Sequence, residues 1–182
     1  MASYPFLVQV AWSGLRATLA EWQKEPDRWL GERDIQVEIA SRLSNIYKLV
    51  GKDSVESKQT QKRWSRVSCE PYVAYTYSDE KPYRCHPDIV VWDDWGKKND
   101  PNYEAGENWP ILWACELKYK VKRPGTWDKE KLSYLVSQGH IRYGCWVTIS
   151  SAGSQSPTGI EWSKDDVHKI KLWHCDVSLP PT

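Results

Sequence analysis

Two apolar stretches decide the fold expected for this chain: Pro87-Asp88-Ile89-Val90-Val91-Trp92 and Ile111-Leu112-Trp113-Ala114-Cys115-Glu116-Leu117-Lys118. Both are short runs rich in β-branched and aromatic residues and bounded by Pro, Asp or Gly, a pattern typical of strands. Because side chains alternate along a strand, Glu116 and Lys118 leave one face and Leu117 leaves the other. Charges on a buried strand are costly unless they are paired or bind a metal. This pattern is a first indication of chemistry.

The composition limits the class of protein. A chain of 182 residues is long enough to form one domain with a real core. Charged residues make up 27% and the net charge is only +1, so any binding of nucleic acid requires a local concentration of positive charge. Trp (12) and Tyr (10) greatly outnumber Phe (1), which favours an aromatic core whose rings keep polar atoms.

The cysteines indicate a reduced, intracellular protein, and we expect it in the cytoplasm. They are odd in number and show no C-x-x-C spacing: Cys69, Cys85, Cys115, Cys145 and Cys175. A zinc module built from Cys85-His86 and His174-Cys175 stays open as a weaker alternative, since adjacent pairs lack the usual ligand spacing. The apolar stretch 6–20 lacks a basic leader and contains Arg16, so we expect neither a signal peptide nor a membrane span.

Helical spacing of apolar residues predicts two helices ahead of the strands, over residues 6–25 and about 30–50. Glu32 lies one turn before Ile35 on the inward face of the second helix, whereas Glu38 points away from it. Glu32 is therefore the acid that could reach a site near the core. The plainer interpretation is that Glu32 favours the positive end of the helix dipole.

The segment between the helices and the quoted strands is expected to be irregular at first and then extended. Residues 52–66 are polar and basic and predict a loop, either solvated or holding a nucleic-acid backbone. Residues 67–77 alternate like one long strand, in which Pro71 marks an edge, a bulge or a break. A turn over 78–82 would join this strand to the Pro87 strand in an antiparallel hairpin, and 93–110 reads as an inserted loop.

The last third predicts a parallel crossover followed by an extension. A helix over 128–138 ends at Gly139, and an apolar strand follows over 143–149. Residues 150–159 are typical of a flexible linker. A short helix near 163–168 and a last strand over 169–177 are expected beyond it.

The motifs and their order resemble a known family. Pro87-Asp88 followed by Glu116-Leu117-Lys118 resembles the PD-(D/E)XK motif of the restriction-endonuclease-like nuclease superfamily. The expected elements resemble its αβββαβ core over roughly residues 28–150, with the Pro-Asp pair on the second core strand and the Glu-x-Lys triplet on the third. We therefore expect one α/β domain over 1–182, with a mixed central sheet flanked by helices. An extra N-terminal helix would occupy 1–27, and a C-terminal extension with a possible strand would occupy 151–182.

The chain also departs from the family. The interval between Asp88 and Glu116 is long, which the inserted loop would explain. The helix after Lys118 offers Lys131 and Tyr134 in place of the Gln-x-x-x-Tyr pattern of the RecB-like branch, so the subfamily is unassigned.

The resemblance implies a metal-dependent endonuclease that hydrolyses phosphodiester bonds, with DNA favoured over RNA. Asp88 and Glu116 would bind Mg²⁺ or Mn²⁺ together with the main-chain carbonyl of Leu117, and Glu32 would ligate through water or help to hold a second ion. Lys118 would orient or deprotonate the attacking water and contact the phosphate. The expected contacts to nucleic acid are Lys120, Lys122, Arg123, Lys131, Lys62 and Arg63. Many small members of the superfamily act as dimers, which makes a homodimer a candidate assembly.

Three other interpretations stay open. The acids and Lys118 could form a salt bridge without catalysis, on a fold that serves as an inactive nucleic-acid-binding or protein-interaction module. The many Trp and Tyr residues could instead form a partner interface. The basic residues, taken singly, could form an ordinary exposed turn.

Overall fold

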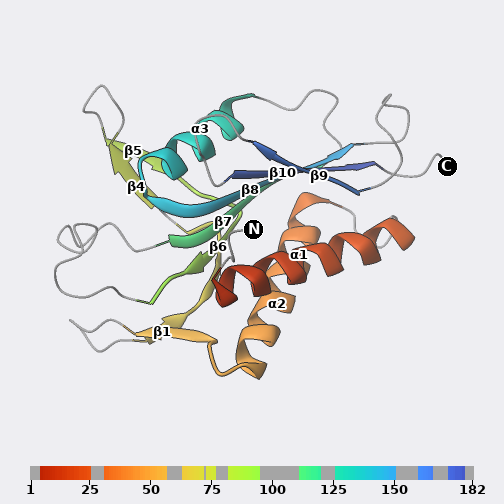
Figure 1. The fold of residues 1–182 in the computed structure, drawn as a ribbon, viewed down its shortest axis with the longest axis horizontal. Helices are drawn as coiled ribbons and strands as arrows, with labels where there is room; N and C mark the ends of the chain where they lie inside the picture. The colour runs from red at the N-terminus through yellow and green to blue at the C-terminus, as the bar shows by residue number, and fades with distance from the viewer. Residues whose placement is uncertain are drawn as a thin grey trace.

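A mixed sheet with helices on both faces organises the chain (Figure 1). The computed structural model describes residues 5–25, 31–56, 63–71, 73–76, 82–94, 111–119, 126–150, 160–165 and 172–178. Most of the loop expected over 93–110 and nearly all of the linker expected over 150–159 lie outside these ranges. The same holds for Lys62, Lys120, Lys122 and Arg123. The expectation of a mixed α/β fold is confirmed.

The six strands of the main sheet follow the order β3-β6-β7-β8-β10-β9 in the described part of the chain. Their bounds are β3 (Val67–Cys69), β6 (Ile89–Trp92), β7 (Ile111–Tyr119), β8 (Ile141–Ser150), β9 (Ile160–Asp165) and β10 (Leu172–Ser178). The first three strands pair antiparallel, whereas β7 with β8 and β8 with β10 pair parallel. The helix α3 (Thr126–Ser137) connects β7 to β8, so the parallel crossover expected from the sequence is confirmed.

The strands β6, β7 and β8 are buried on both faces over most of their length, which explains why they are apolar runs rather than alternating ones. One core cluster joins part of β6 and β7 to α1 (Phe6–Lys24) and α2 (Glu32–Leu49); its strand residues are Ile89, Val91, Leu112, Trp113, Cys115 and Leu117. The other cluster joins Val90, Trp92, Ile111 and Ala114 of the same strands to α3. Figure 1 shows α1 and α2 on one side of the sheet and α3 on the other.

The two N-terminal helices form where the apolar spacing predicts them. Glycine at position 14 lets the helices approach closely, because a Cβ atom there would overlap the side chain of Leu43. The start of α2 is fixed by the Asp34 carboxylate, which accepts a hydrogen bond of 3.1 Å from the main-chain N–H of Gly31. The Tyr47 hydroxyl donates to the carbonyl of Leu7 at 2.6 Å, which holds α2 against the start of α1.

The structure corrects two expectations between the helices and β6. The segment 52–66 is not a plain loop, because β1 (Ser54–Glu56) pairs antiparallel with β2 (Arg63–Ser65). Of the edge, bulge or break expected at Pro71, the structure has the break, which divides the segment into β3 and β4 (Val73–Thr76). Only β3 pairs with β6, whereas β4 pairs with β5 (Pro82–Cys85) in a separate two-stranded sheet. The break follows from Glu70, which has a left-handed φ of 46°, and from Pro71, which has no N–H to donate. Pro82, which was expected in a turn, is the first residue of β5 and lies opposite Thr76.

The C-terminal extension also differs from expectation. Residues 163–165 belong to β9 rather than to a short helix, because antiparallel pairing with β10 supplies their main-chain hydrogen bonds. Residues 166–168 of that expected helix lie outside the described ranges. The expected last strand is confirmed as β10, which joins the main sheet beside β8.

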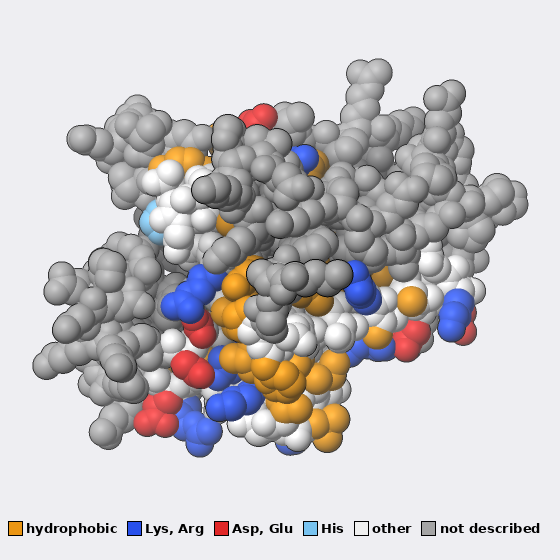
Figure 2. Space-filling view, viewed as in Figure 1, with side chains coloured by type: hydrophobic (Ala, Val, Ile, Leu, Met, Phe, Trp, Pro, Cys, Tyr) orange, Lys and Arg blue, Asp and Glu red, His pale blue; other side chains and the backbone are white. Residues whose placement is uncertain are grey.

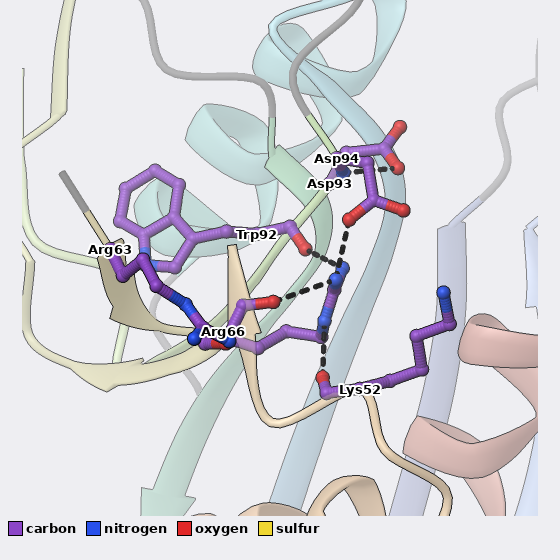
Figure 3. Close-up of polar contacts among 7 residues, drawn as sticks. Lys52, Arg63, Arg66, Trp92, Asp93 and Asp94 are labelled. Atoms are coloured by element: carbon purple, nitrogen blue, oxygen red, sulfur yellow. Dashed lines mark hydrogen bonds and ion pairs between the residues drawn. The ribbon is translucent and has the colours of Figure 1, made fainter. Parts of the chain in front are cut away.

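A buried arginine ties the β1–β2 hairpin to the main sheet (Figure 3). The Arg66 side chain is 1% exposed, and its guanidinium donates to the carbonyls of Lys52, Ser54 and Trp92. It also forms an ion pair of 2.5 Å with Asp94. Arg66 was expected on a solvated or nucleic-acid-binding loop, but each of these contacts is internal and its role is structural.

The described cysteines Cys69, Cys85, Cys115 and Cys145 are free thiols. In the part of the chain that is described, none of the helices has the length and apolar character needed to cross a bilayer.

Candidate active site

The candidate site lies where β6 stops pairing with β7. The paired register of these strands runs from Trp92 opposite Ile111 to Ile89 opposite Cys115, while β7 continues to Tyr119. Beyond Cys115, the side chains of Asp88 and Glu32, rather than a strand, accept hydrogen bonds from the main-chain N–H groups on this edge of β7. The Asp88 carboxylate accepts a hydrogen bond of 2.6 Å from the N–H of Leu117.

The second acid on this edge is Glu32, from the first turn of α2. Its Oε2 accepts a hydrogen bond of 3.0 Å from the N–H of Tyr119. Glu38 instead lies 3.7 Å from Arg42, which also pairs with Glu21 on α1. The choice of Glu32 over Glu38 as the acid near the strand edge is therefore what the geometry supports.

Asp88 is also held through its main chain. Its carbonyl accepts hydrogen bonds from Gln36 Nε2 at 2.6 Å and from the N–H of Glu70 at 3.1 Å. The N–H and C=O of one residue in a strand point to the same edge, so the carbonyl of Leu117 faces the same side as the N–H that Asp88 binds. Asp88 and a main-chain carbonyl of β7 therefore meet at one edge.

Glu116 completes the carboxylate pair from the α3 face of the sheet. It is 3% exposed, and its Oε1 lies 2.9 Å from Lys131 Nζ. Burial, followed by the neighbouring negative charge of Glu116, raises the pKa of Asp88 to about 8. A carboxyl pKa raised on folding means that the metal-free fold loses stability as pH rises from about 4 to about 8.

Lys118 is held by an acid of the following helix. Its Nζ lies 3.1 Å from Asp128 Oδ2, and both side chains are partly exposed. Burial alone would lower the pKa of Lys118, but the hydrogen bond and charge of Asp128 outweigh it, so the pKa is raised. The raised pKa favours the protonated form of Lys118, whose ammonium then acts as a donor.

The predicted nucleic-acid contacts are placed only in part. Lys131 lies inward against Glu116, and Arg63 is exposed and donates to Ser54 Oγ at 2.8 Å. The other four residues of that set lie outside the described ranges. On the face drawn in Figure 2, several of the described Lys and Arg side chains lie beside Asp or Glu, and the others are scattered rather than gathered in one basic patch.

Sequence reasoning missed two residues of the site, Asp128 and Gln36. Asp128 was assigned only to the start of a helix, although its spacing of three residues from Lys131 places both on one helix face. Gln36, which follows Ile35 on the inward face of α2, was given no role, although its side chain donates to the carbonyl of Asp88. The Asp128–Lys118 ion pair and the hydrogen bond from Gln36 to Asp88 do not follow from a motif, because each joins segments that meet only after folding.

The residues present fit a magnesium-type ion better than zinc. Among the described residues, no three His, Cys, Asp or Glu side chains are grouped closely enough to form a ready metal cage. Mg²⁺ does not need such a cage, because it keeps several waters and takes one or two carboxylates. The buried Oε1 of Glu116 has Lys131 Nζ at 2.9 Å as an ion-pair partner but accepts no hydrogen bond of standard geometry. The zinc alternative receives no support from the described residues. The His86 ring contacts the carbonyl of Glu70, and the side chains at 174 and 175 are not described.

A scan against protein-family models finds no match for this chain, and searches of curated proteins and of solved structures find none either.

Proposed function

We propose that this protein is a Mg²⁺-dependent nuclease that hydrolyses phosphodiester bonds of DNA and belongs to the PD-(D/E)XK superfamily. The observation that carries the proposal is the meeting of Asp88, Glu116 and Lys118 at the open end of β7. Asp88 directly precedes β6, Glu116 and Lys118 lie on β7, and a long segment separates the two strands. Glu116 is buried and Asp88 is half-buried. Two neighbouring carboxylates at a site withdrawn from water cost free energy of folding. Placing Asp88 and Glu116 together therefore indicates a functional role rather than a contribution to stability.

The order of elements is a second support. From α2 onward, the main sheet receives β3, β6 and β7, then α3 crosses over and β8 returns parallel to β7. This is the order helix, three strands, helix, strand of the family core, with the β1–β2 and β4–β5 hairpins as insertions. Asp88 directly precedes β6, the strand expected to carry it, and Glu116 lies within β7, so the two motif residues lie close to the positions that the resemblance implies.

In the proposed reaction, Asp88, Glu116 and the Leu117 carbonyl hold the divalent ion. When bound, the ion supplies a water with a lowered pKa and neutralises charge on the phosphate. Asp88 would be ionised in the metal-bound state, because a carboxylate that ligates a metal is deprotonated. Lys118, kept protonated by Asp128, donates to a phosphate oxygen or orients the attacking water. Glu32 holds the end of β7 in register through Tyr119, and could reach a hydrated ion through water.

Several details stay predictions. The roles of Lys120, Lys122, Arg123 and Lys62 as phosphate contacts follow from their charge alone. A homodimer would place one site against each strand of a duplex.

The proposal predicts cleavage that depends on a divalent ion. We expect purified protein to cut DNA with MgCl₂ or MnCl₂ and to be inactive in EDTA. A panel of labelled single-stranded, duplex, nicked and branched DNA, with matched RNA, measured by gel electrophoresis, identifies the preferred substrate. Binding of DNA that falls with salt but never leads to cutting would instead support the inactive binding module. No binding and no cutting across the panel would contradict both.

A further inference from the structure

In the metal-free structure, the Lys131 ammonium forms ion pairs with the carboxylates of Glu116 and Asp128. Its Nζ lies 2.9 Å from Glu116 Oε1 and 3.3 Å from Asp128 Oδ1, and its side chain is only 14% exposed. Asp128 uses its other oxygen, Oδ2, for Lys118. The four side chains thus form a chain of alternating sign, Lys118, Asp128, Lys131 and Glu116, that ends beside Asp88.

A divalent ion and this ammonium compete for the same carboxylate. An ion bound by Asp88 and Glu116 would lie within a few ångströms of Lys131 Nζ, where a double and a single positive charge repel strongly. Lys131 has a second partner, because Asp128 Oδ1 is also within ion-pair distance. It can therefore leave Glu116 without becoming an unpaired buried charge, which would be costly.

We propose that Lys131 is a resident counter-cation, which the divalent ion displaces from Glu116 onto Asp128. Lys131 and Asp128 then set the metal affinity of the site without being ligands. The inference rests on the proposed function, since it concerns the same carboxylates. The pair keeps Glu116 compensated when no ion is bound, and it confines loading of the site to higher concentrations of the ion.

Metal binding to the full chain without nucleic acid tests this inference. We expect Lys131→Gln to bind Mg²⁺ about tenfold more tightly than the unmodified protein in isothermal titration calorimetry with MgCl₂. The matched control is Lys129→Gln, on the same helix, where the ammonium lies over the Trp146 ring at 5.7 Å. Its affinity should change less than that of Lys131→Gln, because Lys131 Nζ lies 2.9 Å from Glu116 Oε1 whereas the Lys129 ammonium lies over an indole ring.

A second variant should change the Mg²⁺ affinity in the opposite direction, and it tests the inference if Lys131→Gln does not fold. Asp128→Asn removes the alternative partner, so Lys131 remains on Glu116 and Mg²⁺ affinity should fall by about fivefold or more. That fall should shrink in the double variant with Lys131→Gln, because the coupling passes through the lysine. Unchanged or weaker binding by folded Lys131→Gln, or unchanged binding by Asp128→Asn, would overturn the inference.

Glu116→Gln separates this inference from the proposed function. If the unmodified protein binds Mg²⁺ and Glu116→Gln does not, the metal site stands whatever Lys131 does. If the unmodified protein and Glu116→Gln give the same heats, or neither binds, the proposed function itself is wrong.

Discussion

Glu116→Gln is expected to reduce Mg²⁺-dependent DNA cleavage by about a thousandfold or more while the fold is kept. The amide has the size of the carboxylate and suits the same buried position, but it removes a charged ligand from the proposed ion. Lys131 keeps Asp128 as a partner, so no cation is left without a counter-charge. The measurement is the initial rate of cutting at saturating MgCl₂, with circular dichroism and thermal melting as checks of the fold.

The matched control is Glu130→Gln, an exposed position on the same helix as Lys131. It removes the same charge from the protein without touching the carboxylate pair, and its rate should stay within about twofold of the unmodified protein. A folded Glu116→Gln protein that cuts within tenfold of the unmodified rate would show that Glu116 is not part of the reaction.

Arg66→Met is expected to lower the free energy of unfolding by about 3–5 kcal/mol, the largest loss of stability that we predict for a single change. Methionine replaces the long stem, but the carbonyls of Lys52, Ser54 and Trp92 and the Asp94 carboxylate all lose their donor. Buried acceptors left unpaired cost about 1–3 kcal/mol each before relaxation. Urea unfolding followed by tryptophan fluorescence gives the free energy.

Arg63→Met serves as its control, three residues away on β2. Arg63 is exposed and donates to Ser54 Oγ, so the loss should stay under about 1 kcal/mol. A loss for Arg66→Met no larger than that for Arg63→Met would show that the buried guanidinium does not hold the hairpin to the sheet.

Patterns within one segment predicted the elements that form the frame of the fold. The periodic apolar residues of α1 and α2, and the apolar runs of β6, β7 and β8, are buried by the same faces that their spacing indicates. The parallel crossover followed from a helix between two apolar strands. Asp88 and Glu116 were singled out because charges beside buried strands need a reason, and the register brings them to one edge.

Contacts between distant segments are what the sequence could not supply. Arg66 looked like one more basic residue of a polar stretch, yet three carbonyls and Asp94 surround it after folding. The turn at Glu70 and Pro71 splits one alternating pattern between two sheets, and alternation alone cannot say which sheet receives each half. The ion pair between Asp128 and Lys118 depends on how α3 packs against β7, so the sequence alone did not identify Asp128 as a partner of Lys118 and Lys131.

The central claim is that Asp88 and Glu116 bind one divalent ion between them. Anomalous diffraction from a crystal of this protein grown with MnCl₂ tests it most directly. The account predicts a peak within about 2.0–2.4 Å of a carboxylate oxygen of each residue. A well-ordered site without a manganese peak, or a peak elsewhere with Asp88 still bonded only to Leu117, would contradict it.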